Sequence, residues 1–322
     1  MRKYISIFIA FFLFISVNAQ QKTKVKEKTK SSVTENAKSN SPLDIAVIER
    51  ETGLKGKQNK EEYKITIPQN DLQVSVDGFK IIPAMGLGTW VAFTPHGTGT
   101  MIMGDLVLTE NDLKPVQQEI INQGLTISAI HNHFIRNHPN IVYMHIGGMG
   151  STDEMSRKVH AVLMAIQNSR GHNPASSPAD SVSTTLDAKS LDAIIGSTGE
   201  WSKGVYKYTI GRPDVTLKEH GATITTFFGF NTWAAWQGTP ERAAVAGDFT
   251  MLENEVEPVI KALIQNGIEV VALHNHMVHE QPRIFFLHYW GVGNAEQLAR
   301  GLKAALNETG KGQSDHMHMM HH

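Results

Sequence analysis

The chain has 322 residues, of which 41% are hydrophobic and 19% are charged, a composition typical of a globular protein with a packed core. The formal net charge is −1, which gives no indication of a nucleic-acid partner or of an anionic membrane surface. There is no cysteine, which excludes disulfides, thiolate metal ligands, a cysteine nucleophile and a lipid-modified N-terminal cysteine.

The N-terminal residues predict export. Arg2 and Lys3 precede an apolar run of about 13 residues, too short for the roughly 20 that span a bilayer, and small residues follow it. We therefore expect a signal peptide over residues 1–19, a periplasmic or secreted protein and no transmembrane segment in the mature chain. Residues 20–41 are polar and predict a disordered linker.

The predicted elements occur in one order twice. Residues 42–167 form a first repeat, with helices expected over Val116–Asn122 and Met155–Ile166. Residues 168–185 are polar, carry Gly171, Pro174, Pro178 and several serines, and predict a linker to a second repeat over residues 186–308. The His- and Met-rich residues 309–322 predict a disordered tail.

The second repeat shows its elements most clearly. In chain order we expect a short helix over Leu191–Ile195, a strand over Val205–Ile210, hairpin arms over Ala222–Trp236 and Arg242–Leu252, a helix over Glu255–Asn266, strands over Ile268–Met277 and Pro282–Trp290, and a helix over Ala295–Leu306. The order α-β-β-β-α-β-β-α in each repeat predicts an α+β fold. Because one unit alone would leave a sheet face bare, the two repeats should pack as one body about a pseudo-two-fold axis.

A set of histidines repeats with a constant offset. His131-Asn132-His133 followed by His145 recurs as His274-Asn275-His276 followed by His288, and 274 − 131 and 288 − 145 both equal 143. The same offset relates Thr89-Trp90 to Thr232-Trp233, Asp105 to Asp248 and Glu110 to Glu253. A copy that differs at most other positions while it keeps these residues indicates the parts of a site.

Alternation along a strand explains why this spacing predicts a metal site. His274 and His276 would lie on one face of a strand, with Asn275 on the other. If the next strand returns antiparallel in matching register, His288 points beside them. Three neutral imidazoles with one open position are typical of catalytic zinc, and imidazole also suits copper, nickel and iron. The equivalent ligands in the first repeat are His131, His133 and His145.

The alternative is a hydrogen-bonded polar cluster that joins sheet to helix. Buried imidazoles without a metal or a partner cost on the order of 2 kcal/mol per polar group, so such a cluster predicts short hydrogen bonds to backbone or carboxylate and no space for an ion.

Acidic residues supply candidates for proton transfer. Glu110 and Glu253 are predicted acid/base groups, fourth ligands or partners of an imidazole N–H, although acidic residues also favour a helix N-terminus. Asp105 and Asp248 lie five residues earlier. They could also be fourth ligands, partners of an imidazole N–H or acid/base groups, or could simply mark a turn.

The repeated motifs resemble those of the LppY/LpqO family of exported bacterial proteins. The resemblance is carried by residues 85–90, Gly104-Asp105, His131-Asn132-His133, residues 272–277 and residues 283–291. It implies export and a duplicated architecture but names no reaction, and the lipoprotein members carry a cysteine that this chain lacks. The ligand spacing is also similar to that of acetolactate decarboxylase, as an analogy for the chemistry only.

These observations predict an exported metalloprotein that uses a three-histidine, zinc-type centre for lyase or hydrolase chemistry on a small oxygenated substrate. The alternative is a non-catalytic periplasmic protein that binds a metal or a small ligand. An enzyme should have a deep pocket over an open metal position, whereas a carrier site should be closed by a fourth protein ligand or lie on the surface. Nothing in the sequence selects an oligomeric state.

Overall fold

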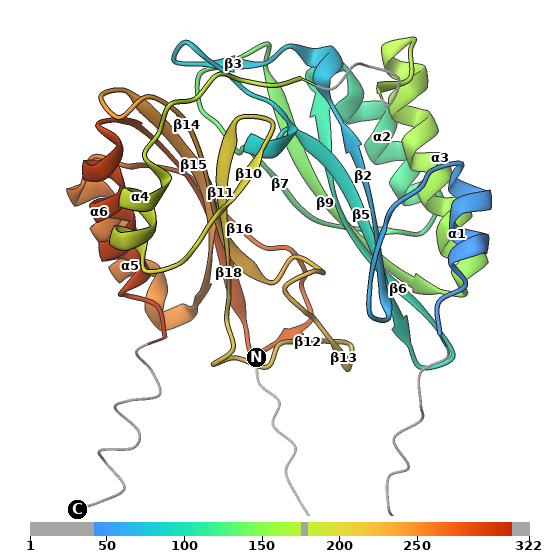
Figure 1. Cartoon of the computed structure of the whole chain (residues 1–322). Helices are drawn as coiled ribbons and strands as arrows, with labels where there is room; N and C mark the ends of the chain where they lie inside the picture. The colour runs from blue at the N-terminus through green and yellow to red at the C-terminus, as the bar shows by residue number, and fades with distance from the viewer. Residues whose placement is uncertain (1–41, 175–179, 311–322) are drawn as a thin grey trace, which may run out of the picture. The chain divides into compact units, whose positions relative to one another are not determined.

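The computed structural model describes residues 42–174 and 180–310 (Figure 1). The predicted signal peptide, the linker over residues 20–41 and residues 311–322 of the tail lie outside the described residues. The described residues belong to one compact unit. Among the described residues, no helix is both long enough and apolar enough to cross a membrane.

The first repeat is a six-stranded antiparallel sheet with three helices. Its elements are α1 (Ile45–Thr52), β1 (Lys57–Asn59), β2 (Glu62–Pro68), β3 (Ser75–Val76), β4 (Phe79–Lys80), β5 (Gly88–His96), β6 (Gly99–Thr109), α2 (Glu110–Asn122), β7 (Thr126–His131), β8 (Asn137–His138), β9 (Ile141–Gly150) and α3 (Thr152–Arg170). The large sheet has the order β1-β2-β5-β6-β9-β7, and β4-β3-β8 form a small second sheet.

The second repeat has the same architecture. Its elements are α4 (Ala188–Ile195), β10 (Glu200–Ser202), β11 (Val205–Gly211), β12 (Lys218–Glu219), β13 (Ala222–Thr223), β14 (Asn231–Gly238), β15 (Ala243–Leu252), α5 (Val256–Gln265), β16 (Glu269–His274), β17 (Glu280–Gln281), β18 (Ile284–Gly293) and α6 (Ala295–Leu306). The large sheet has the order β10-β11-β14-β15-β18-β16, and β13-β12-β17 form the small one. The α+β fold with two tandem repeats is therefore confirmed.

The structure moves several predicted boundaries. The expected hairpin arm Ala222–Trp236 is divided, because a turn that ends at Gly229, with φ +105°, separates β13 from β14. Helix α2 begins six residues before the expected Val116, since Thr109 and Asp112 form a capping box at its start. Helix α3 continues to Arg170, into the segment expected to be a linker.

Each large sheet has a core on either side. On one face, the helices of the same repeat cover it, as Figure 1 shows for α1, α2 and α3 on the first sheet and for α4, α5 and α6 on the second. On the other face, the cores combine both repeats. Phe134 and Tyr143 belong to a cluster with Trp290, and Met101 and Met103 to a cluster with Phe286. The repeats therefore bury their remaining sheet faces against each other.

Reciprocal contacts reveal a local two-fold relation between the repeats. Gly86 has φ +103°, and a Cβ placed on it would lie 3.1 Å from the ring of Trp233. Gly229 has φ +105°, and a Cβ there would lie 3.1 Å from the ring of Trp90. Contacts in which residue i meets residue j while the equivalent of i meets the equivalent of j are the signature of two-fold packing. The glycines allow both the left-handed backbone and the close approach of the indoles.

We predict that Gly247→Ala destabilises the fold. Gly247 lies on β15 between the backbone oxygen of Trp233 and the hydroxyl of Tyr289, which donates to that oxygen at 3.1 Å, and an added Cβ would overlap both. The free energy of unfolding should fall by about 1–3 kcal/mol in urea denaturation, the usual effect of overpacking. Gly293→Ala is the control, because its nearest contact would be Leu298 at 3.9 Å. Equal stabilities of the two variants would contradict the prediction.

Candidate metal centre

The strand register brings the histidines of one repeat together. In the second repeat, β16 and β18 pair antiparallel, with His274 opposite Phe286 and Ala272 opposite His288. His274 and His288 are therefore diagonal neighbours on one face of the sheet, as expected from the alternation. His276 lies beyond the end of β16, in the loop that follows it. In the first repeat, β7 and β9 place Ala129 opposite His145 in the same way.

All six histidines meet in one buried cluster between the repeats. His131 of the first repeat stacks on His274 of the second, with ring centroids 3.9 Å apart. The centroids of His133 and His288 are 3.7 Å apart, and those of their counterparts His276 and His145 are 4.1 Å apart. The site is therefore shared by the repeats, where the sequence predicted one separate site in each.

Two histidines have a defined tautomer. The Nδ1 atom of His145 lies 3.2 Å from the carbonyl oxygen of Gly104, and that of His288 lies 3.0 Å from the carbonyl oxygen of Gly247. Because a carbonyl only accepts, Nδ1 must carry the proton in both rings. The Nε2 atom of each ring then carries a free lone pair, and neither Nε2 has a hydrogen-bond partner among the described residues. Orientation of an imidazole by a backbone carbonyl is typical of metal-binding histidines.

The central histidines, His131 and His274, have no side-chain hydrogen-bond partner among the described residues. Both ring nitrogens of His131 and both of His274 are buried and unpaired within the part of the chain that the structure describes. Burial lowers the pKa of each ring well below its usual value, and the surrounding imidazoles lower it further, so both are neutral. A cluster that served only to join elements by hydrogen bonds would pair these atoms. Their state fits a metal site better.

Two aspartates complete the cluster. Asp105 on β6 has Oδ2 3.3 Å from Nε2 of His133, and Asp248 on β15 has Oδ2 3.3 Å from Nε2 of His276. Burial raises the pKa of Asp105 to about 6, partly opposed by His145, and raises the pKa of Asp248 well above its usual value. Carboxylates that are desolvated in this way lack a positive charge beside them, and a bound divalent ion would supply that charge.

The donor atoms form two groups that share no residue. One is Asp105, His131 and His133, and the other is His145, His274 and His276; in each, one ligand atom per residue lies within 4.8 Å of the others. The 143-residue relation adds His288 to the first group and Asp248 to the second. We name these set A (Asp105, His131, His133, His288) and set B (Asp248, His274, His276, His145). A third group, His131, His274 and His288, connects the two sets.

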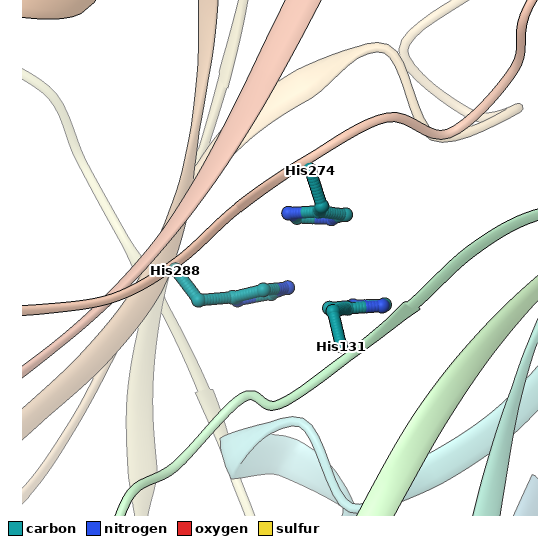
Figure 2. Close-up of side chains that lie close together, drawn as sticks. All are labelled: His131, His274 and His288. Carbon is teal, nitrogen blue, oxygen red and sulfur yellow. The ribbon is translucent and has the colours of Figure 1, made fainter.

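Ring orientation separates His131 from His274. Their planes are inclined by only 10°, and Figure 2 shows them in nearly parallel layers with His288 beside them. An imidazole binds an ion in the plane of its ring, so two rings stacked face to face direct their lone pairs into different planes. Two imidazoles on one tetrahedral zinc have centroids about 5 Å apart, given Zn–N bonds of about 2.0–2.1 Å. The centroids of His131 and His133, and those of His274 and His276, are 5.2 Å apart and match this spacing. The centroids of His133 and His288, and those of His276 and His145, are closer than this spacing, at 3.7 and 4.1 Å, but their planes are inclined by 33° and 35°.

A cavity of about 530 Å³ opens over the cluster. Both aspartates line it, together with His133, His145, His276 and His288. Residues from both repeats line the remainder at equivalent positions, among them Lys64 and Lys207, Thr66 and Thr209, and Trp90 and Trp233. Six of the eight residues of the cluster therefore line the cavity, whereas His131 and His274 do not.

The predicted acid/base residues do not lie in this cavity. Glu110 is exposed in the first turn of α2, where it accepts a hydrogen bond from Asn140, and Glu253 is exposed at the 3-10 turn before α5. Both occupy the helix-start position that was the alternative to a catalytic role, so Asp105 and Asp248 are the carboxylates of the site. Lys64 and Lys207 also line the cavity and were not predicted from the sequence, although the 143-residue offset relates these two lysines as well.

The family comparison matches both repeats. The model of the family described as Domain of Unknown Function (DUF1259) matches residues 46–165 and again residues 189–308. The chain belongs to this family. Each of the two matches covers one repeat of the fold described above.

Other comparisons add little to this assignment. No curated protein matches the sequence. A trimeric bacterial microcompartment shell protein, PduB, has a TM-score of 0.22 at 11% identity, covering 82% of this chain and 94% of its own. EtuB from Clostridium kluyveri has a TM-score of 0.19 at 8% identity, covering 83% and 93%. TM-scores this low carry no information about fold or function.

We predict that nitrogen-detected NMR of the metal-free DUF1259 chain, labelled with ¹⁵N-histidine, shows the Nδ1-protonated tautomer for His145 and His288. The Gly104 and Gly247 carbonyls require it. His145→Gln and His288→Gln assign the two signals. An Nε2-protonated tautomer at either residue would show that the lone pair does not face the cluster.

Proposed function

We propose that this protein is an exported metalloenzyme whose centre holds two divalent ions between the repeats, zinc being the first candidate. In this proposal the ions serve lyase or hydrolase chemistry on a small oxygenated substrate. The observation that carries it is the pair of buried Nε2 lone pairs on His145 and His288, each held in place by a backbone carbonyl and left without a partner among the described residues.

The ligand assignment follows the two sets. Set A would hold one ion and set B the other, each with one carboxylate and three imidazoles, donors that suit zinc and its neighbours in the transition series. Each set takes its aspartate and two histidines from one repeat and its third histidine from the other. The face-to-face stacking of His131 on His274 supports two ions, since these rings do not share one.

The open cavity favours an enzyme over a carrier. A bound divalent ion would polarise a substrate oxygen or lower the pKa of a water molecule. The chain's own residues would supply the rest: the aspartates balance the charge, the indoles of Trp90 and Trp233 form walls, and the cavity admits the substrate. A non-catalytic metal-binding protein is the second candidate, and it would explain the same donors without needing the cavity.

Export is part of the proposal. The basic start and apolar run of residues 1–19 support a signal peptide, and the resemblance to the LppY/LpqO family supports a periplasmic or secreted location. A site built from imidazole and carboxylate, without thiolate, is also compatible with an oxidising compartment.

We predict about two zinc ions per chain by elemental analysis of protein purified without an affinity tag. The four histidines of the C-terminal tail, His316, His318, His321 and His322, should be changed to alanine throughout, because they would bind metal independently of the cluster. In this background, His131→Ala with His274→Ala should remove both ions, since each set loses a ligand. His160→Ala, an exposed histidine on α3, is the control and should keep both. Unchanged zinc in the double variant would exclude the cluster as the metal site.

We predict that two double histidine variants distinguish a centre that takes ligands from both repeats from a centre built within one repeat. His145→Ala with His274→Ala removes two members of set B and should leave about one ion on set A. His145→Ala with His131→Ala removes one member of each set and should leave none. If each repeat held its own ion, as the sequence alone predicted, these two outcomes would be exchanged. Isothermal titration with zinc, at matched thermal stability of the variants, provides the measurement.

A further inference from the structure

Two lysines stand at equivalent positions in the wall of the cavity. Lys64 on β2 and Lys207 on β11 are related by the 143-residue offset, and both line the cavity over the metal centre. Nζ of Lys64 lies 4.5 Å from the ring centre of Trp90, and Nζ of Lys207 lies 4.3 Å from that of Trp233. Contact with an aromatic face attracts an ammonium group and limits the positions that it adopts.

Neither lysine has an ion-pair partner in the part of the chain that the structure describes. Among the described residues, no carboxylate lies within 4.0 Å of either Nζ, although both side chains are half-buried. Burial lowers the pKa of each amine to about 8, and for Lys64 the charge of Lys207 adds to the decrease while Glu62 opposes it. The two ammonium groups therefore repel each other and lack the counter-charge that a half-buried cation favours.

The charges around the cavity also favour an anionic ligand. Its only acidic lining residues are Asp105 and Asp248. Two divalent ions would more than neutralise these carboxylates, so the loaded cavity would be strongly cationic, with the lysines adding to the charge of the centre. The threonines Thr66 and Thr209 add hydroxyl groups at equivalent positions. Such a lining recognises oxygen anions.

We propose that Lys64 and Lys207 bind the two anionic groups of a small organic dianion, a dicarboxylate, and hold it in the cavity above the metal centre. The proposal rests on the proposed function for the identity of the reacting centre, but the lysine pair itself needs no metal. The pseudo-two-fold relation places one lysine from each repeat in the cavity wall. This arrangement favours a ligand with an anionic group at each end over a ligand with a single charge. A cavity of about 530 Å³ accommodates such a molecule together with water.

The alternative is that each lysine serves only to pack on its tryptophan. The aliphatic stems and the cation–π contacts would then be the whole role, and replacement by an apolar side chain of similar length would leave ligand binding unchanged. The two interpretations therefore differ in what Lys64→Met and Lys207→Met do to an anion.

Calorimetric titration of the zinc-loaded full chain, with the tail histidines replaced, tests the proposal. Succinate should bind at least tenfold more tightly than propionate, and succinamide, which is uncharged, should not bind. Lys64→Met and Lys207→Met should each weaken succinate at least tenfold, whereas Lys64→Arg and Lys207→Arg should retain most of the affinity. Lys189→Met on α4, an exposed lysine outside the cavity, is the control and should bind as the wild type does. Zinc content should be the same in all five variants, because no lysine is a ligand.

A second measurement separates this proposal from the proposed function. Limited acetylation followed by peptide mass spectrometry reports the reactivity of each lysine, and succinate should protect Lys64 and Lys207 but not Lys189, with or without zinc. If zinc binds and succinate neither binds nor protects, the dianion proposal is wrong and the metal centre stands. If no zinc binds but succinate still protects both lysines, the proposed function is wrong and the dianion site stands. Equal binding of succinate by wild type and the methionine variants would also overturn the proposal.

Discussion

The burial of uncompensated polar groups between the two large sheets is the constraint on which the rest of the structure depends. Six imidazoles and two carboxylates lie buried at this interface, and most of their nitrogen and oxygen atoms face only one another. Each unpaired buried polar group destabilises a fold by about 1–3 kcal/mol. The cores on both sides, from Phe134 and Trp290 to Met103 and Phe286, offset that destabilisation. A protein that keeps such a cluster at equivalent positions of two otherwise divergent repeats uses it for something other than stability.

The shared cluster also explains why the repeats are inseparable. In the proposed assignment, each repeat provides two histidines and one aspartate for one set, and the histidine on its β9 or β18 strand for the other set. The ligand atoms of His145 on β9 lie within 4.8 Å of those of His274 and His276 in the other repeat. The sheet faces that carry these residues are the same faces that one repeat alone would expose. The same packing of one repeat on the other therefore forms both the core and the site.

The sequence allowed much of this to be predicted, for identifiable reasons. The apolar stripe of α6 and the alternation of β11 are local signals, and the constant offset between repeats locates the histidines without any knowledge of the fold. The diagonal contact of His274 with His288 followed from strand periodicity. The contact between histidines of the two repeats could not be predicted, because the offset shows which residues are equivalent but not which copies touch. The sequence also could not show which acidic residues line the cavity, because Glu110 and Asp105 are only five residues apart and the register of β6 against β9 is needed to place Asp105 opposite His145.

The two halves of the cluster are not identical, because the aromatic residue that stacks on the equivalent histidine differs between the repeats. His133 stacks on the ring of Tyr143, whereas its counterpart His276 stacks on Phe286. The Tyr143 hydroxyl is buried and finds no hydrogen-bond partner within the described residues, so set A has a phenol beside it that set B lacks. Asn59 and Phe227 similarly line the cavity without an equivalent residue across the axis. A molecule entering a perfectly symmetric chamber would bind equally well in two opposite orientations, but these differences make one orientation more favourable, so that duplication followed by a few replacements is sufficient to impose direction on a two-fold scaffold.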